Sequence, residues 1–541
     1  MPALQSSQSR TRCCWQFLQR SLQNRPESLR IGWRPGCTLR SVLARLTASV
    51  VVGIDAIPVN VEVDVSSGLP GLTVVGLPDA TVRESRERVR AAIRNSGFPF
   101  PLDRITVSLA PADIRKIGAA FDLPIALGIL AAAGLLPHSD RRALTIVGGL
   151  SLDGSVPPLR GLLPMAVAAR RAGHPIMFPV GNLAEAAVVP GLSGWAVATL
   201  MDAARAYASP EPPAPLASRP SSLPGEVPVD DLSDVRGQLV ARRALEIAAA
   251  GGHHLLLSGP PGVGKTMLAR RLPGLLPPLD FDEALTVTTI HSVAGTLAPG
   301  CGLLTERPFR APHHTASEVA LVGGGSHPRP GELSLAHAGV LFLDELPEFS
   351  RRVLDTLRQP LEHGRVHIAR ANRTAVFPAD VMLVGAMNPC PCGYFGTGIK
   401  PCKCPAGAPE RYRRRLSGPL RDRFDLTLEL PPVKYAEWQS QEAPESTAAV
   451  RARVMAARQR QAKRQSTTNA RIDAASAKRH CVLDDKGRSL LGAAVDRFGW
   501  SARSATRIVR VARTIADLAG AEQIAAAHLA EALQLRTQEE N

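Results

Sequence analysis

Hydrophobic and polar residues change their spacing several times along the chain. Residues 50–65 alternate apolar and polar side chains, as a strand does, and residues 79–95 predict a charged helix. Residues 105–109 are again typical of a strand. Residues 121–136 form an almost uninterrupted apolar run that opens with Asp and Pro, which predicts a buried helix. This mixture indicates an α+β unit that spans residues 43–208.

The remaining pattern divides the chain further. Residues 209–228 are dense in Pro and Ser, which is the composition of a linker. Residues 229–432 predict a second unit, of the α/β class, and residues 433–541 are rich in Ala, Arg and Gln and predict a helical C-terminal domain. Residues 1–42 contain a single acid, Glu27, among many Arg, Ser and Gln, and we expect a disordered extension there.

Composition narrows the class of protein. Of 541 residues, 45% are hydrophobic and 21% charged, which fits a soluble globular protein. The formal net charge of +16 favours polyanion partners, nucleic acid first, although a genome rich in arginine codons would give the same charge. The longest apolar run, residues 123–137, is too short to cross a bilayer. We therefore expect a cytoplasmic protein without a membrane segment.

A phosphate-binding motif lies in the α/β unit. Residues 259–266, GPPGVGKT, match GxxxxGK[ST], between a predicted strand at 254–258 and a predicted helix at 267–276. In this context backbone N–H groups wrap the phosphates, Lys265 neutralises the β and γ phosphates, and Thr266 ligates Mg²⁺. The predicted nucleotide-binding residues are Gly259, Pro260, Pro261, Gly262, Val263, Gly264, Lys265, Thr266 and, further along the chain, Asp344.

Two more strands end in polar side chains that suit the same chemistry. The apolar residues 340–343 lead into Asp344 and Glu345, at the strand end where ligands of an open α/β sheet bind. We expect Asp344 to hold Mg²⁺ through water and Glu345 to polarise the attacking water; a buried strand ending in solvated acids is the alternative. Residues 381–387 form a third apolar strand, and Asn388 at its end can hold the lytic water.

Arginines follow these strands at two places. A guanidinium in the stretch Arg421-Asp-Arg423 could reach a phosphate bound by a neighbouring copy, as a finger in trans. Arg503 opens a helix in the C-terminal domain, and we expect it over the nucleotide. Each signal alone is common, but their order in one chain predicts a magnesium-dependent ATPase.

Four stretches together resemble the magnesium-chelatase-like AAA+ ATPase family: GGHHLLLSGPPGVGKT, FRAPHHTASEVALVGGGSHPRPGELSLAHAGVLFLDELPEF, AMNPCPCGYFG and ARSATRIVRVARTIADL. The resemblance covers the chain from about residue 43 to the C-terminus. It implies an AAA+ P-loop core with a C-terminal helical lid, assembled as a homo-hexameric ring. It also implies a helicase that promotes branch migration when incoming DNA recombines during natural transformation, with single-stranded or branched DNA as partner.

The resemblance assigns roles by position. Lys265 and Thr266 correspond to the Walker A motif of that family, and Asp344 and Glu345 to Walker B. Asn388 matches sensor 1, Arg423 rather than Arg421 matches the arginine finger, and Arg503 matches sensor 2. The implied cofactors are ATP and Mg²⁺.

Residues 43–208 resemble the Lon-protease-like domain (S5 domain 2-like) of this family. Lon proteases carry a nucleophilic Ser in a Gly-x-Ser setting before the buried helix. Here the corresponding stretch, residues 116–123, reads KIGAAFDL and contains neither Ser nor Thr. Because covalent catalysis needs a nucleophile, we expect no peptidase activity, and a role in ring assembly or DNA contact instead.

Four of the nine cysteines lie within fifteen residues, in the loop 389–408. Cys390, Cys392, Cys402 and Cys404 can supply four thiolates to tetrahedral Zn²⁺. Their CxC spacing is tighter than the usual CxxC, and a reduced loop without metal is the alternative. We favour a structural zinc.

Several weaker signals concern DNA and metals. Residues 365–377 predict a hairpin, and Arg370 and Arg373 near its tip are candidate phosphate contacts. The glycine-rich residues 321–331 could form a mobile pore loop. The basic helix 451–464 could contact DNA or simply be solvated. Metal binding is possible at a group of histidines, although we favour packing: His313, His314, His327 and His337.

An ATP-driven DNA motor is therefore the function that the sequence favours. The alternative is a chelatase-type motor subunit that remodels a protein partner, and stimulation of ATP hydrolysis by DNA would separate the two. A scaffold without activity is disfavoured by the complete set of ATPase signals, and a protease by the missing nucleophile.

Overall fold

A computed structural model of the protein describes residues 43–137, 141–217, 230–325, 328–370, 373–433, 435 and 444–536. The predicted disordered extension 1–42, most of the linker 209–228, and His327 lie outside the described residues. Within them, residues from Leu43 onward cluster as one unit.

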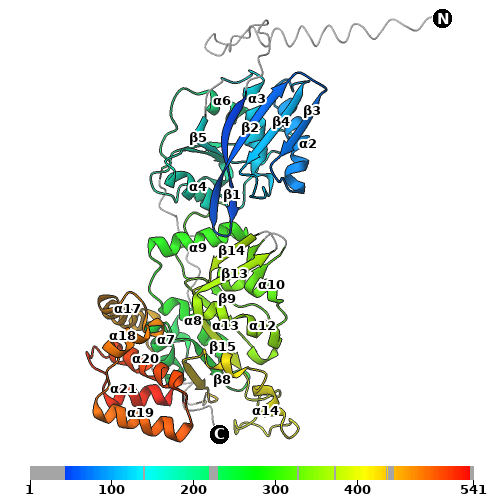
Figure 1. Ribbon diagram of the computed structural model, residues 1–541. Coiled ribbons are helices and arrows are strands. Elements are labelled where there is room, and N and C mark those ends of the chain that lie inside the picture. Colours follow the sequence, from blue (N-terminus) through cyan, green and yellow to red (C-terminus); the bar gives the residue numbers. More distant parts are fainter. Residues whose placement is uncertain are drawn as a thin grey trace, which may run out of the picture. The chain divides into compact units, whose positions relative to one another are not determined.

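The N-terminal part contains a seven-stranded sheet of order β3-β4-β2-β1-β5-β6-β7 (Figure 1). The pairs β1–β2 and β2–β4 are antiparallel, and the other neighbours are parallel. The predicted strand 50–65 proves to be two strands, because the chain turns at Gly53 with a φ of 67°. The strands are β1 Ala44–Val52, β2 Asp55–Ser66, β3 Gly71–Val75, β4 Arg104–Ala110, β5 Arg141–Ile146, β6 Ile176–Pro179 and β7 Gly194–Val197.

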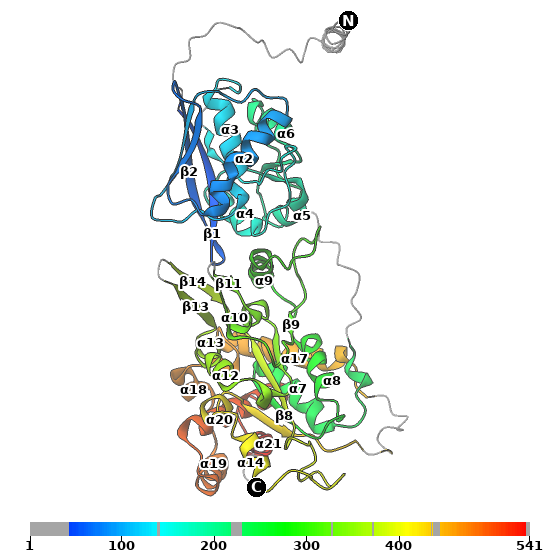
Figure 2. The same ribbon diagram turned by 90° about the vertical axis from the view of Figure 1, so that its right-hand side faces the viewer.

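Helices α2 and α3 cover one face of this sheet (Figure 2). Asp79 caps α2, Ala80–Asn95, by accepting a hydrogen bond from the backbone N–H of Val82 at 2.8 Å. Every residue of α3, Asp122–Ala132, is buried, as the apolar run predicts. The negative charge of Asp122 is balanced by Arg88, whose Nε lies 2.8 Å from the carboxylate. The other helices here are α4 Leu162–Arg171, α5 Leu183–Ala186 and α6 Leu200–Ala208.

The second part contains a five-stranded, entirely parallel sheet of order β16-β8-β15-β12-β9. The strands are β8 Leu255–Ser258, β9 Phe309–Arg310, β12 Val340–Leu343, β15 Met382–Met387 and β16 Leu426–Glu429. Strands β12 and β15 are buried along their whole length, which is typical of a parallel sheet covered on both faces. The predicted apolar strands before the P-loop, Asp344 and Asn388 are confirmed.

Alternate residues of these strands enter different cores. Leu255, Leu257 and Phe342 pack with α7 Leu239–Gly251 and α8 Lys265–Leu275. Leu341 and Leu383 pack on the other face with a second set of short helices. These and the remaining helices are α9 Phe281–Ala294, α10 Glu318–Val322, α11 Glu332–Leu335, α12 Arg351–Thr356, α13 Arg358–His363, α14 Ala408–Arg413 and α15 Gly418–Arg421.

The strand order positions the site. Numbered along the chain, the five strands lie in the order 5-1-4-3-2, so β15 separates β8 from β12. Because the strands are parallel, the P-loop after β8, Asn388 after β15 and Asp344 after β12 all emerge at the carboxyl edge. Asn388 therefore lies between the other two.

A hairpin precedes β15, as predicted. Strands β13 Arg365–Arg370 and β14 Arg373–Pro378 pair antiparallel, with Arg370 opposite Arg373 at its tip. The two residues between them, and the side chains of both arginines, lie outside the described part. The glycine-rich stretch 321–331 forms a short ladder of β10 Gly323–Gly324 and β11 Arg329–Pro330, interrupted by the undescribed residues 326–327.

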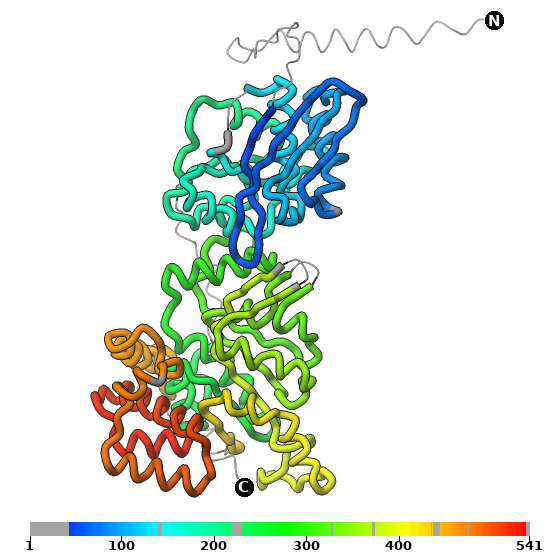
Figure 3. The backbone as a smooth tube through the Cα atoms, viewed as in Figure 1, coloured from blue at the N-terminus to red at the C-terminus, as the bar shows by residue number. Residues whose placement is uncertain are grey.

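The C-terminal domain is helical, as predicted, and its orange and red helices gather together in Figure 3. Its apolar residues share one continuous hydrophobic cluster with β8, β15, α7 and α8, to which Val454, Ile508, Ile515 and Leu529 contribute. The helices are α17 Thr447–Arg464, α18 Ala474–His480, α19 Asp485–Phe498, α20 Ala502–Leu518 and α21 Ala526–Gln534.

The basic helix α17 uses its arginines inside the protein. Arg453 Nε lies 2.5 Å from Glu246, Arg458 Nη2 donates to the carbonyl of Ala249 at 2.8 Å, and Arg460 Nη1 donates to the carbonyl of Asp517 at 2.7 Å. These contacts hold α17 against α7 and α20, while Arg460 and Lys463 stay exposed, so DNA contact and solvation both remain open for residues 451–464.

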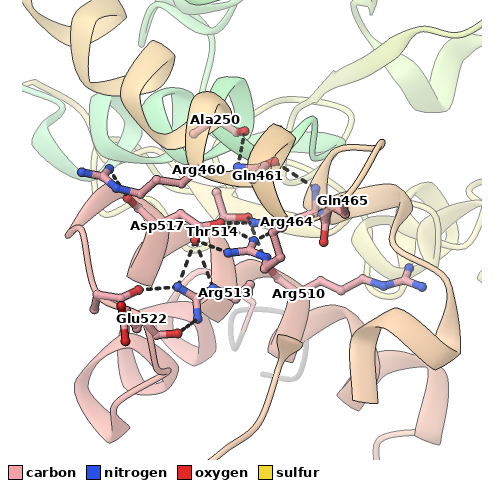
Figure 4. Close-up of polar contacts among 12 residues, drawn as sticks. Ala250, Arg460, Gln461, Arg464, Gln465, Arg510, Arg513, Thr514, Asp517 and Glu522 are labelled. Carbon is pink, nitrogen blue, oxygen red and sulfur yellow. Dashed lines mark hydrogen bonds and ion pairs between the residues drawn. The ribbon is translucent and has the colours of Figure 1, made fainter. Parts of the chain in front are cut away.

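Asp517 of α20 is the centre of the densest of these contacts (Figure 4). The carboxylate is 1% exposed, and it accepts hydrogen bonds from Arg464 at 2.8 Å, from Arg513 at 2.9 Å and from Asn469 Nδ2 at 2.7 Å. A buried carboxylate needs such partners. The network therefore ties α17 to α20.

No helix among the described residues combines the length and apolarity that a bilayer crossing would need.

Candidate nucleotide-binding site

The P-loop connects β8 to the amino end of α8. Gly262 and Gly264 have φ values of 85° and 90°, which other residues adopt only with strain. Because α8 begins at Lys265, its first backbone N–H groups face the loop, an arrangement that attracts phosphate. Local sequence explains this geometry, since the glycines permit the turn and the helix follows directly.

Lys265 lies inside the loop and is only 9% exposed. Its Nζ donates hydrogen bonds to the carbonyl oxygens of Gly259 at 2.6 Å and Pro260 at 3.0 Å, and to Asn388 Oδ1 at 2.9 Å. Burial lowers the pKa of Lys265, while the Asp344 and Glu345 carboxylates oppose that change. The structure thus brings the predicted Walker A lysine and sensor 1 amide into direct contact.

Thr266 and Asp344 meet across the sheet. Thr266 Oγ1 donates to Asp344 Oδ2 at 2.8 Å, although Thr266 lies in the first turn of α8 and Asp344 follows β12. A hydroxyl and a carboxylate side by side supply the oxygen ligands that Mg²⁺ prefers, with further positions left to water and phosphate. The pair therefore fits the predicted magnesium site.

Glu345 follows Asp344 in a left-handed conformation, with a φ of 51°. Its Oε2 lies 3.3 Å from His314 Nδ1, and its side chain is 52% exposed. His314 also stacks on His313, with ring centroids 4.1 Å apart. The sequence drew attention to His314 only as a member of a histidine group, so its contact with the predicted catalytic base was missed.

The histidine group does not gather into one site. His337 Nδ1 accepts a hydrogen bond from the backbone N–H of Asp380 at 3.0 Å, away from His313 and His314. Among the described residues, only the four cysteines form a group suited to a metal ion. Of the four histidines, His313, His314 and His337 form ring contacts, a hydrogen bond and a contact with Glu345, and His327 lies outside the described residues.

Arg423 lies at the opposite edge of the sheet from the P-loop. It precedes β16, which runs parallel to β8, so it belongs to the amino edge. Its Nη2 lies 2.7 Å from Glu362 Oε2, and its Nε is buried without a hydrogen-bond partner among the described residues. Arg421 is exposed. Neither arginine can reach the phosphates of its own chain across the length of β8.

Arg503 also lies near the amino edge, which differs from the expected position over the chain's own nucleotide. The neighbouring Ser504 Oγ accepts from Arg536 Nη2 at 3.4 Å, and Arg536 Nη1 donates to the carbonyl of Phe424 at 3.4 Å. One turn later, Arg507 Nε lies 3.8 Å from Asp425. These long-range contacts fix the start of α20 beside residues 424–425.

The buried His253 makes two further side-chain contacts at the amino edge. His253 Nε2 lies 2.8 Å from Thr514 Oγ1, and His253 Nδ1 lies 3.3 Å from Asp425 Oδ2. Burial alone would raise the pKa of Asp425, but the His253 hydrogen bond and the nearby Arg507 charge hold it at about 2. Asp425 is therefore an ionised anchor for the C-terminal domain.

Comparison with known proteins agrees with this geometry. Family profiles described as magnesium chelatase, subunit ChlI, match residues 231–438; subunit ChlI of Mg-chelatase, residues 61–182; and the ChlI C-terminal region, residues 444–536. The uncharacterized protein YifB of Salmonella typhimurium is 45% identical over 502 residues, which cover 91% of this chain and 97% of that protein. The competence protein ComM of Haemophilus influenzae is 44% identical over 502 residues, with the same two coverages.

The chain belongs to the magnesium-chelatase-like family of YifB and ComM proteins.

Membership of the YifB and ComM family points to ATPase activity, with ATP and Mg²⁺ as cofactors. A more distant relative, the magnesium-chelatase 67 kDa subunit of Chlorobaculum parvum, is 29% identical over 163 residues, 29% of this chain and 23% of that protein. The mixed α/β architecture and the parallel sheet around the P-loop agree with the predicted fold class.

This YifB and ComM family chain also brings its four clustered cysteines together. Their sulfur atoms all lie within 4.8 Å of one another. Cys390 Sγ lies 3.4 Å from Cys392 Sγ and 3.7 Å from Cys402 Sγ, and Cys392 Sγ lies 3.6 Å from Cys402 Sγ. A disulfide would need about 2 Å. Four sulfurs around tetrahedral Zn²⁺ are separated by about 3.8 Å, since the Zn–S distance is about 2.3 Å, so the cluster fits the ion.

Proposed function

We propose that this protein is a magnesium-dependent ATPase that assembles into a homo-hexameric ring and moves DNA. Its action would be that of a helicase or branch-migration factor on single-stranded or branched DNA, during recombination of incoming DNA in natural transformation. The observation that carries the proposal is the separation of the predicted site into two halves, at opposite edges of one sheet. The name of the relative ComM, a competence protein, supports the biological setting.

The carboxyl edge would bind and cleave ATP. Lys265 would exchange its contacts with Gly259 and Pro260 for the phosphates, and Thr266 and Asp344 would hold Mg²⁺. Asn388, already beside Lys265, would place the water, and Glu345 would accept its proton. His314 would hold the Glu345 carboxylate until that step, because it already lies 3.3 Å away.

The amino edge would serve the next copy in the ring. Arg423 would leave Glu362 and bind the γ-phosphate held by the neighbouring copy. Arg503 is exposed at the same edge, so we propose that it too acts on the neighbour's nucleotide rather than its own.

DNA contact would fall to the hairpin of β13 and β14. The backbones of Arg370 and Arg373 are paired in register at its tip, where phosphate contacts are expected. The net charge of +16 supports a polyanion partner. Residues 43–208, as a Lon-like domain without a nucleophile, would contribute to ring assembly or DNA contact, and residues 433–541 would form the lid.

We further propose Zn²⁺ as the ion held by Cys390, Cys392, Cys402 and Cys404. The sulfur separations fit the ion, and the thiols are free. Bound there, Zn²⁺ would act as a structural ion with no part in ATP cleavage. Elemental analysis of the reduced, chelator-free protein tests this, and a metal content well below one per chain would contradict it.

The decisive experiment is strand exchange on a branched DNA substrate with ATP and Mg²⁺. We expect the protein to move the branch point and to hydrolyse ATP faster when DNA is added. The Lys265→Ala variant is the matched control, since it removes the phosphate contact and leaves the DNA hairpin unchanged. A protein that stays monomeric with nucleotide and DNA, and does not turn over ATP, would contradict the proposal.

A chelatase-type motor that acts on a protein partner is the second candidate. It is favoured by family profiles named for magnesium chelatase, which together match most of the chain. Such a motor has no need of DNA. Hydrolysis that is indifferent to DNA but rises with a protein partner would therefore favour it.

A further inference from the structure

The cysteine loop, residues 389–408, has little secondary structure and few buried residues to stabilise its shape. Between Asn388 and Gly407 the chain forms no helix or strand, and in residues 389–408 only Cys390 and Gly393 are buried. Phe395 and Ile399 are both 44% exposed, so there is no apolar core inside the loop. Segments of this kind depend on a metal or a disulfide for a defined shape.

The loop contacts the P-loop directly. Gly393 has a φ of 83°, and a Cβ at this position would lie only 2.6 Å from Pro261 Cδ. The backbone of the cysteine loop is therefore packed against a residue of the phosphate-binding turn. Only glycine fits at position 393 unless Pro261 moves.

The segment contacts the two other strand ends as well. Tyr412 is buried near the backbone of Asn388, and burial raises the pKa of Tyr412 to about 12 although the nearby Asn388 N–H acts in the opposite direction. Arg415 Nη1 lies 2.8 Å from Glu348 Oε2, in the short turn that follows Glu345. Three contacts from one segment thus reach the ends of β8, β15 and β12.

The cysteines join the two ends of this segment. Cys390 and Cys392 precede Gly393, whereas Cys402 and Cys404 lead into α14, which carries Tyr412. A shared ion would fix the Gly393 contact relative to the Tyr412 and Arg415 contacts, whereas four free thiols would leave the two ends joined only by exposed chain.

We propose that the metal-bound cysteine loop is a clamp that sets the geometry of the three catalytic strand ends, so that ATP affinity depends on Zn²⁺. The inference rests on the proposed ATP and Zn²⁺ sites and adds a dependence between them. It assigns the loop a positioning role, since none of its side chains needs to touch the nucleotide.

The first test removes the metal from the full-length protein. A mercurial reagent releases Zn²⁺ from thiolates, a colorimetric chelator counts it, and thiols followed by added Zn²⁺ restore it. We expect loss of Zn²⁺ to weaken binding of a fluorescent ATP analogue about 10-fold, and restoration to reverse this. A variant with Cys13→Ser, Cys14→Ser, Cys37→Ser, Cys301→Ser and Cys481→Ser controls for reaction at the five cysteines outside the cluster.

The second test keeps the metal and breaks the contact. Gly393→Ala should retain one Zn²⁺ per chain but bind the ATP analogue about 10-fold more weakly, because its Cβ displaces Pro261. Gly396→Ala is the matched control: its φ is 74°, so backbone strain is similar, but nothing lies within 4 Å of the added Cβ. Gly396→Ala should keep both Zn²⁺ and ATP affinity.

The outcomes are distinguishable. If zinc-loaded and zinc-free protein bind the analogue equally, or if Gly393→Ala binds as Gly396→Ala does, the clamp is wrong while the ATPase proposal stands. If purified protein binds ATP tightly without any metal, the metal assignment and the clamp are both wrong. If zinc-loaded protein binds no ATP, the proposed function itself fails.

Discussion

The two edges of the core sheet carry charged residues in very different settings. At the carboxyl edge, Lys265 contacts Asn388 at 2.9 Å and Thr266 contacts Asp344 at 2.8 Å, so the motif residues contact one another. At the amino edge, Arg423 is paired with Glu362 at 2.7 Å and Arg503 is exposed. At the carboxyl edge the motif residues thus contact one another, whereas at the amino edge the predicted arginines are paired with acids or exposed.

In the proposed function, a second copy supplies the arginine that completes each ATPase site. The carboxyl edge has a lysine, candidate magnesium ligands and a candidate base, and the arginine nearest to it in the contacts described above, Arg415, is paired with Glu348. Arg423 and Arg503, which the sequence predicts to bind the γ-phosphate, are separated from the carboxyl edge by the length of β8. Mutations at the two edges should therefore behave differently when variants are mixed.

The largest effect is expected at the amino edge, with Arg423→Ala. An arginine finger contributes about 10³-fold or more to phosphoryl transfer, so turnover of the pure variant should fall by about that factor. Mixing it with Lys265→Ala should restore part of the activity, since some contacts then pair an intact P-loop with an intact arginine. Steady-state ATP hydrolysis across mixing ratios measures this, and an absence of recovery would argue against action in trans.

Glu345→Gln tests the carboxyl edge. General base catalysis contributes about 10²- to 10⁴-fold, so hydrolysis should fall by about 10³-fold while ATP still binds. Binding of a fluorescent analogue and single-turnover hydrolysis separate the two steps. Full turnover by this variant would show that Glu345 is not the base.

Lys265→Ala should act on affinity. Hydrogen bonds to charged groups contribute about 1.5–3 kcal/mol each, so loss of the ammonium should weaken ATP binding about 100-fold. Titration with the analogue measures the dissociation constant. Unchanged affinity would mean that nucleotide binds elsewhere.

The smallest effect concerns two arginines one turn apart on α20. Arg507, whose side chain is 13% exposed beside Asp425, should contribute about 1–2 kcal/mol to the free energy of unfolding. Arg503→Ala is the control, since an exposed side chain should leave the urea midpoint unchanged while turnover falls. If Arg503→Ala instead destabilises the fold, its role is structural and the amino edge has one candidate catalytic arginine fewer.

The carboxyl edge could be predicted because each of its motifs is local. The P-loop, Asp344 and Asn388 each follow an apolar strand within a few residues, and parallel strands bring their ends together. The catalytic roles of Glu345, Asn388, Arg423 and Arg503 stay predictions, as does DNA contact by Arg370 and Arg373.

The position of Arg503 could not be predicted, because it depends on contacts such as Arg507 with Asp425 that no local pattern reveals. The same reason explains why the contacts of the basic helix α17 could not be predicted. The sequence of α17 predicts an exposed charged surface, but Arg453 is paired with Glu246. Glu246 lies 207 residues earlier in the chain, so no local pattern links the two. The contact of His314 with Glu345 has no local signal either.

The hydrophobic cluster shared by β8 and α20 limits how this protein can move. A C-terminal helical domain joined to the sheet by one uninterrupted core cannot swing on a hinge without opening that core to water. The amides of α20 and β8 should consequently exchange with solvent in a single cooperative event. In the proposed ring, the work done by each cleaved nucleotide would then displace whole protomers as rigid bodies, rather than bend any one of them.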